Sequence, residues 1–160
     1  MIVHPIPPVF DRRSEILILG SFPSVRSRES GFFYGHPRNR FWRVTAACFG
    51  CETPETIPEK KRFLLEHHLA VWDVIAACEI EGSADSAIRR PVPNDLSVIL
   101  NAAPVRRILT NGQTAKKYYD RLILPGTGRE AVCLPSTSPA NAAKSLEELI
   151  DIWRGALTDL

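Results

Sequence analysis

The sequence predicts an α/β fold in which a parallel sheet is covered by helices on both faces. Short apolar runs alternate along the chain with stretches in which apolar residues recur at helical spacing. The first of these runs is continuously apolar, as expected of a strand that is buried on both faces. The chain has 160 residues, 44% of them hydrophobic, and no internal repeat, so residues 1–160 are expected to form one domain with one core.

The first half of the chain predicts two strands and two helices. The first strand is expected at residues 15–19, where a glycine ends the apolar run. A helix is expected at 40–49 because its apolar residues lie near one face. A second helix at 58–68 begins with a proline, which is favoured in a first turn. The apolar run LAVWDVI predicts the second strand at 69–75.

The second half continues the same alternation. Residues 79–93 are polar and interrupted by glycine and proline, so an irregular connection is expected there. The elements expected after it are a short helix at 96–102, a strand at 105–110, a helix at 113–122, a strand at 130–134 and a final helix at 142–158. In such folds, ligand sites lie beyond the carboxyl ends of the strands.

The net charge of +2 does not by itself indicate a nucleic-acid partner, but the charge is unevenly distributed. Residues 21–43 hold five arginines and a single acidic residue, whereas residues 145–160 hold four acidic residues and one arginine. A basic segment opposite an acidic one gives a small protein a preferred side for a polyanion. A solvated basic loop would have the same composition.

No apolar run approaches the roughly 18 residues that a membrane span needs. Residues 1–10 lack the basic start of a secretory signal. A cytoplasmic protein is therefore expected, associated with the nucleoid if the organism is a prokaryote. We expect it to be a monomer.

The four cysteines do not predict a metal centre. Cys48 and Cys51 form a C-x-x-C pair, but no second pair accompanies it, so an iron–sulfur cluster is disfavoured. Cys78 and Cys133 have apolar neighbours and are expected to be buried free thiols. The sequence contains no zinc-binding pattern, and no metal or cofactor is expected.

Residues 31–42, GFFYGHPRNRFW, are the segment richest in chemical groups. Its aromatic residues suit stacking against a base, and its arginines suit phosphates. The aromatic residues could equally anchor a long loop onto the core. The earlier GSFP segment at 20–23 is neither a dinucleotide fingerprint nor a phosphate loop, because the required glycines and lysine are missing.

Several segments, in this order, resemble the uracil-DNA glycosylase superfamily, and most closely its hypoxanthine (deoxyinosine) DNA glycosylase branch. These segments are LILGSFPS, GFFYGHPRNRFW, WDV with GS.DS.I and PVPND, TNG, and LPSTSPAN. The resemblance extends over residues 15–143 and implies a three-layer α/β/α sandwich with a four-stranded parallel sheet. It also implies a monofunctional DNA repair glycosylase that hydrolyses the N-glycosidic bond of a deaminated base, hypoxanthine or uracil, flipped out of DNA.

The resemblance also implies catalytic residues. Phe22 stands where much of the superfamily has an Asn or Asp that orients the attacking water. The hypoxanthine branch transfers this role to the residue that corresponds to Asn39, whose amide oxygen could hold the water; a helix cap is the structural alternative. His36 could stabilise the departing base or contact a phosphate. Leu134 replaces the His or Asn that usually opens the second motif and assists the leaving base.

Base recognition is expected to involve Asp73, which aligns with the superfamily position that contacts the base edge. Its carboxylate could accept from the ring N–H, or simply cap a turn. Phe22 is expected to sandwich the base with Phe33 or Tyr34. Asn111 could be a second base-binding residue or only part of a turn.

The residues expected to contact DNA outside the base pocket lie in the two motif loops and the basic segment. They are Ser21, Ser24, Arg38, Arg40, Ser136, Thr137 and Ser138.

Three other functions fit parts of the sequence. A mismatch-specific uracil/thymine-DNA glycosylase would use the same fold on pyrimidines. A non-catalytic nucleotide- or DNA-binding α/β module would share the loops without the chemistry. An esterase-like hydrolase is disfavoured because the G-x-S-x-G elbow is missing.

Overall fold

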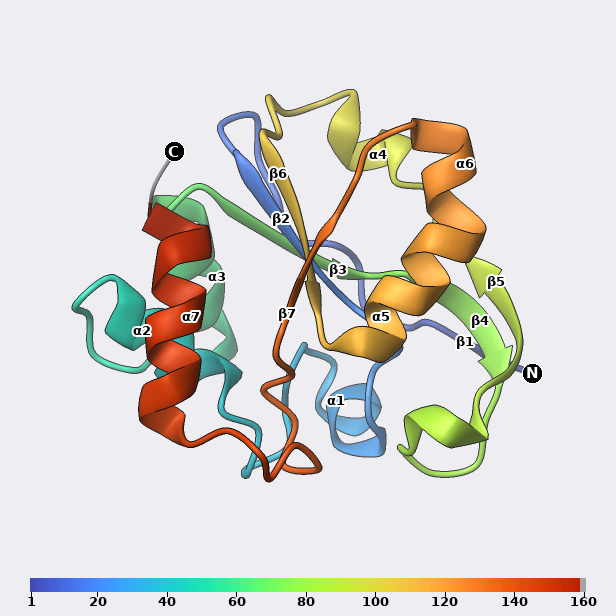
Figure 1. The fold of residues 1–160 in the computed structure, drawn as a ribbon, viewed down its shortest axis with the longest axis horizontal. Helices are drawn as coiled ribbons and strands as arrows, with labels where there is room; N and C mark the ends of the chain where they lie inside the picture. Colours follow the sequence, from blue (N-terminus) through green and yellow to red (C-terminus); the bar gives the residue numbers. More distant parts are fainter. Residues whose placement is uncertain (159–160) are drawn as a thin grey trace.

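The computed structural model describes residues 1–158 and is built on a four-stranded parallel sheet (Figure 1). Its strands are β2 (Ile16–Gly20), β3 (Leu69–Asp73), β6 (Arg107–Asn111) and β7 (Val132–Leu134), in the order β3-β2-β6-β7. All three pairings are parallel, so the carboxyl ends of the strands meet at one edge. The α/β fold and its four-stranded parallel sheet are confirmed.

Helices cover both faces of the sheet, as the continuous apolar runs predict (Figure 1). On β2, Ile16 and Ile18 enter one apolar core while Leu17 and Leu19 enter the other. The first face is covered by α2 (Phe41–Cys48), α3 (Ile57–Glu66) and α7 (Leu146–Thr158). The second face is covered by α4 (Ser97–Leu100), α5 (Gln113–Tyr118), the π-helical turn η2 (Tyr119–Ile123) and α6 (Leu124–Thr127).

A second, antiparallel sheet was not expected from the sequence. The chain leaves the parallel sheet at Asp73 and enters β4 (Ile75–Glu79), which pairs with β1 (Ile2–Val3) and β5 (Arg89–Pro93). The expected strand at 69–75 therefore spans the junction of two sheets. The connection expected to be irregular at 79–93 holds β5 and the 3-10 turn η1 (Asp85–Ala87).

One helix was also missed. Helix α1 (Val25–Ser30) begins after Ser24, whose side chain accepts from the Ser27 N–H, and ends at Gly31 in the left-handed conformation. It lies at the end of the molecule where β2, β6 and β7 finish (Figure 1).

The expected burial of the two isolated cysteines is half right. Cys78 is buried in the core of the second face. Cys133 is exposed because β7 is the edge strand of the parallel sheet, with its outer side open. None of the helices in residues 1–158 is long and apolar enough to cross a membrane.

Candidate active site

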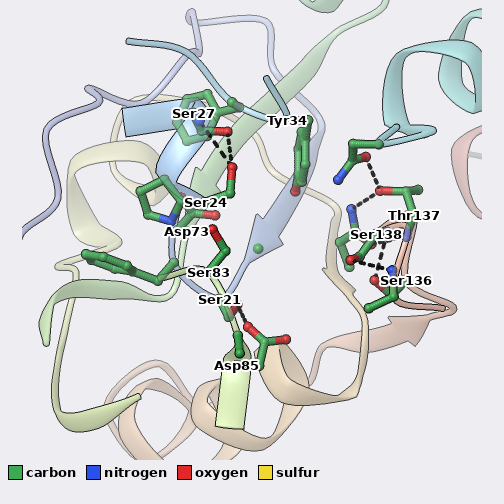
Figure 2. Close-up of a pocket in the computed structure, with 18 of the residues that line it drawn as sticks. Ser21, Ser24, Ser27, Tyr34, Asp73, Ser83, Asp85, Ser136, Thr137 and Ser138 are labelled. Carbon is green, nitrogen blue, oxygen red and sulfur yellow. Dashed lines mark hydrogen bonds between the residues drawn. The ribbon is translucent and has the colours of Figure 1, made fainter. Parts of the chain in front are cut away.

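A pocket of about 360 Å³ lies beyond the carboxyl ends of the parallel strands. Figure 2 shows Ser24 and Asp73 on one side of it, Ser136, Thr137 and Ser138 on the other, and Tyr34 between the two groups. Ser24 and Ser136 to Ser138 come from the loops after β2 and β7, Asp73 is the last residue of β3, and Tyr34 lies between α1 and α2. The carboxyl ends of the strands are where ligands bind in open α/β sheets.

Asp73 forms the inner wall at the end of β3. Its side chain is only 5% exposed, and its Oδ2 lies 2.7 Å from His4 Nε2. Its Oδ1 lies against the α-carbon of Gly20, the residue paired with it across the sheet, and a β-carbon at that position would overlap the oxygen. No donor within residues 1–158 is hydrogen-bonded to Oδ1, which leaves this oxygen as a free acceptor next to the pocket.

Tyr34 places a buried hydroxyl beside Asp73. The residue has a φ of 52°, and its ring stacks on Phe41 at a centroid distance of 4.1 Å. The hydroxyl makes no hydrogen bond of good geometry within residues 1–158, although the Asn111 side chain lies close enough to lower its pKa slightly. Burial, and then the negative charge of Asp73, raise the pKa of the phenol far above its usual value. The group therefore stays protonated and can donate a hydrogen bond to a ligand in the pocket.

Three loops are joined by a chain of hydrogen bonds through Thr137. Its hydroxyl donates to Asn39 Oδ1 at 2.9 Å and accepts from Asn111 Nδ2 at 2.9 Å, while its N–H donates to Asn111 Oδ1 at 3.0 Å. Asn39 Oδ1 also accepts from the Phe41 N–H at 2.9 Å. Because backbone N–H groups can only donate, these contacts identify the oxygen of each amide.

The network decides what Asn39 can offer a ligand. Both acceptor positions of its amide oxygen are occupied. Its Nδ2 group makes no hydrogen bond with residues 1–158, and the side chain lines the pocket. The N-cap position of α2 is Arg40, and Asn39 accepts from the N–H of the first helical residue, Phe41. Asn39 therefore combines a hydrogen bond to the start of α2 with a free N–H donor.

The comparisons with known proteins agree with this geometry. The family model of the uracil DNA glycosylase superfamily matches residues 7–156. The chain belongs to this superfamily. Two relatives are described as hypoxanthine DNA glycosylases. That of Methanosarcina acetivorans is 41% identical over 143 residues, 88% of this chain and 89% of the relative, and that of Methanosarcina barkeri is 36% identical over 94% of each.

A solved structure supports the same assignment. The solution NMR structure of a candidate uracil DNA glycosylase from Methanosarcina acetivorans superposes with a TM-score of 0.80 at 36% identity. The match covers 97% of this chain and 98% of that one. The uracil-DNA glycosylase-like fold expected from the resemblance is therefore confirmed.

Among the aromatic residues expected to hold a base in this superfamily member, the structure separates three situations. Phe33 is 2% exposed and belongs to the core, and it also lines the pocket. Tyr34 has one ring face covered by Phe41, and it lines the pocket, where its hydroxyl lies beside Asp73. Phe22 is half-buried, lines the pocket, and carries the Arg28 guanidinium 5.7 Å from its ring centre. Stacking of a base on Phe22 stays a prediction.

The arginines of the basic segment have different roles: one forms hydrogen bonds within the protein, and another is exposed. Arg40 donates to the carbonyl oxygens of Lys144 and Asn141 at 2.7 and 2.8 Å, so it ties the loop after β7 to the start of α2. Arg38 is exposed. His36 is not among the residues that line the pocket, and its Nδ1 accepts from the Arg38 N–H. Both roles expected of His36, contact with a phosphate and stabilisation of the departing base, stay predictions.

The serines expected to contact DNA line the pocket, and each of them makes a hydrogen bond with another residue of the protein. Ser24 caps α1, and the Ser21 hydroxyl donates to Asp85 at 2.8 Å. Ser136 Oγ accepts from the Ser138 N–H at 3.1 Å. Thr137, also expected to contact DNA, is fully buried and belongs to the network described above. DNA contact by the four serines remains a prediction.

Sequence reasoning missed two residues at this site. Asp85 reaches the pocket from the connection between β4 and β5; it lies in the GS.DS.I segment, but no role was expected for it. His4 holds Asp73 from the N-terminal segment, where no motif or periodicity marks it. Only the long-range pairing of β1 with β4 explains its approach. Among residues 1–158, no group of three or more His, Cys, Asp or Glu side chains could hold a metal ion.

Proposed function

We propose that this protein is a monofunctional DNA glycosylase that hydrolyses the N-glycosidic bond of a deaminated base flipped out of DNA. Hypoxanthine is the expected base, with uracil as the second candidate. The observation that carries the proposal is the pairing of a free acceptor, Asp73 Oδ1, with a free donor, the Tyr34 hydroxyl, against the same glycine. The relatives named as hypoxanthine DNA glycosylases support it.

Deamination changes the edge that this pair would contact. Adenine and cytosine present a ring nitrogen acceptor beside an amino donor, whereas hypoxanthine and uracil present a ring N–H beside a carbonyl oxygen. Asp73 can accept from the N–H while Tyr34 donates to the carbonyl oxygen. An undamaged adenine would instead place a lone pair against the carboxylate. Sites of this kind reject analogues strongly because their buried polar groups are left unpaired.

The reaction replaces one bond with another. A water adds to C1′ of the sugar, the bond from C1′ to the base breaks, and its electron pair leaves with the base. The proton that the water loses balances the proton that the base gains. The transition state has positive charge on the sugar and negative charge on the base, so donors that face the base lower the barrier. Tyr34 and the Nδ2 group of Asn39 are two donors in the pocket that make no hydrogen bond of good geometry within residues 1–158.

For Asn39 we therefore propose the reverse of the role expected from the resemblance. Its oxygen already accepts two hydrogen bonds and has no position left for a water. We place the function of Asn39 in its N–H groups. They would stabilise the leaving base, a need created by Leu134, which cannot donate.

A glycosylase of this kind leaves an abasic site without cutting the strand. No lysine lines the pocket in residues 1–158, so no amine is available there for a Schiff base. We further expect the protein to act on DNA as a monomer, in the cytoplasm, associated with the nucleoid if the organism is a prokaryote.

The test uses oligonucleotides that carry one hypoxanthine, one uracil or no lesion, together with G·U and G·T mismatches. We expect release of hypoxanthine, strand cleavage only after alkali, no adduct after borohydride, and full activity in EDTA. Release only from the G·U and G·T mismatches would favour the mismatch-specific alternative. Binding without release from any substrate would indicate a non-catalytic module and would overturn the proposal.

A further inference from the structure

His4 reaches the pocket wall from the far end of the chain, 69 residues from Asp73 in sequence. Its side chain is 3% exposed. The His4 N–H donates to the Ala76 carbonyl at 2.7 Å, immediately after β1 pairs with β4. The ring also packs edge-on against Phe22 at a centroid distance of 5.8 Å and lies 6.0 Å from Phe33. The imidazole is thus held in place by backbone pairing and by two aromatic rings.

The hydrogen bonds of this imidazole identify its tautomer. The backbone N–H of Ile6 donates to His4 Nδ1 at 3.2 Å. A nitrogen that accepts carries a lone pair, so the proton of a neutral imidazole lies on Nε2. His4 Nε2 therefore donates to Asp73 Oδ2 at 2.7 Å.

This bond determines which carboxylate oxygen faces a ligand. The main chain of Asp73 is fixed by a hydrogen bond, in which its carbonyl accepts from Asn94 Nδ2 at 2.8 Å. The carboxylate could still turn about its last torsion, which is soft for an Asp side chain. Holding Oδ2 on His4 keeps Oδ1 against Gly20 and beside the Tyr34 hydroxyl.

We propose that His4 is a positioning residue for base recognition, which holds the Asp73 carboxylate so that its free oxygen accepts from the ring N–H of the flipped base. The inference rests on the proposed function, because His4 acts only through Asp73. It extends the recognition site to the N-terminal segment, outside all the motif loops.

The test compares His4→Leu with His4→Gln under single-turnover conditions on hypoxanthine DNA. Leucine fills a similar space without a donor, whereas the glutamine amide can donate to Asp73. We expect His4→Leu to lower the maximal cleavage rate at saturating protein by about 10- to 100-fold, the loss typical of a hydrogen bond to a charged group. Affinity for undamaged DNA should not change, and His4→Gln should recover most of the rate.

His68 offers a matched control. Its Nδ1 lies 3.3 Å from Glu15 Oε2, which makes it a second histidine–carboxylate pair, but its side chain is 42% exposed and does not line the pocket. His68→Leu and His68→Gln should both cleave at the wild-type rate. The melting temperature of every variant is measured on the same preparation, so that the rates refer to folded protein.

The outcomes separate the two proposals. No release of any base by the wild-type protein would overturn the proposed function and the role of His4 together. Cleavage by the wild type with an unchanged rate in His4→Leu would overturn only the role of His4. Equal losses in His4→Leu and His4→Gln, both folded, would also overturn it, because they would assign the effect to packing.

Discussion

Replacing Asn39 with Asp separates the two roles that the structure gives this side chain. An aspartate keeps an oxygen where Oδ1 accepts from the Phe41 N–H and the Thr137 hydroxyl, each at 2.9 Å. It replaces the free N–H donor with a second oxygen. We expect Asn39→Asp to be as stable as the wild type or more so by about 0.3–1 kcal/mol, because a negative charge is favourable at the start of α2.

The same substitution should abolish most of the catalysis. Loss of one well-placed donor to a developing negative charge lowers the rate by roughly 10²-fold or more, about 3 kcal/mol. Asn39→Ala should lose the rate and also the two accepted hydrogen bonds, each worth about 1 kcal/mol. Its melting temperature should therefore fall by about 4–8 °C. Single-turnover cleavage of hypoxanthine DNA and thermal unfolding on one preparation measure both effects.

The added negative charge needs a control, since it could weaken DNA binding on its own. Asn101→Asp adds the same charge at an exposed residue after α4, away from the pocket, and should cleave at the wild-type rate. Cleavage by Asn39→Asp within about threefold of the wild type, or faster, would refute the donor role. It would show that an oxygen is sufficient at this position, as expected if the residue holds the attacking water.

Three further predictions concern the same fold. Tyr34→Phe should lower excision about 10-fold, the effect of one lost hydrogen bond, while the melting temperature stays level or rises because the removed hydroxyl is buried and makes no hydrogen bond of good geometry within residues 1–158; full activity would contradict this. Gly20→Ala should reduce the single-turnover rate roughly 10²-fold, since the added methyl group would displace Asp73, whereas Gly155→Ala, which meets open space, should be fully active. Burial raises the pKa of Cys48 from 9.0 to about 11, so the thiol contributes stability below pH 9 that is lost as the pH rises to 11. The melting temperature should therefore fall less in Cys48→Ala than in the wild type over this range, and an equal fall would contradict the assignment.

The parallel sheet could be predicted because its strands are local, continuous apolar runs such as that of β2. The antiparallel sheet could not, because its strands depend on distant partners: β1 has only two residues, and β5 contains Pro91 and Pro93. Prolines within a run argue against a strand, except at an edge, which is where β5 lies.

The site residues could likewise be predicted where local sequence marks them, and not where their role depends on distant contacts. Asp73 and Asn39 could be selected from strand ends and motif segments, since both lie where ligands bind in α/β folds. What Asn39 offers could not be read from its identity, because an amide has both a donor and an acceptor and only its neighbours decide which is free. His4 left no trace in the sequence, since its effect arises from a contact with Asp73 that spans 69 positions.

The junction of the two sheets has a consequence for how a base is selected. Directly after Asp73, the N–H groups of Val74 and Ile75 donate to the carbonyls of Gly20 and Ser21 at 2.8 and 3.1 Å, and directly before it Trp72 pairs with Leu19 in the parallel sheet. The backbone that carries Asp73 is therefore hydrogen-bonded both before and after this residue, without any contribution from DNA. Selection can then work by rigidity: an unsuitable base meets a surface that does not adapt to it, and returns to the helix instead of being accommodated.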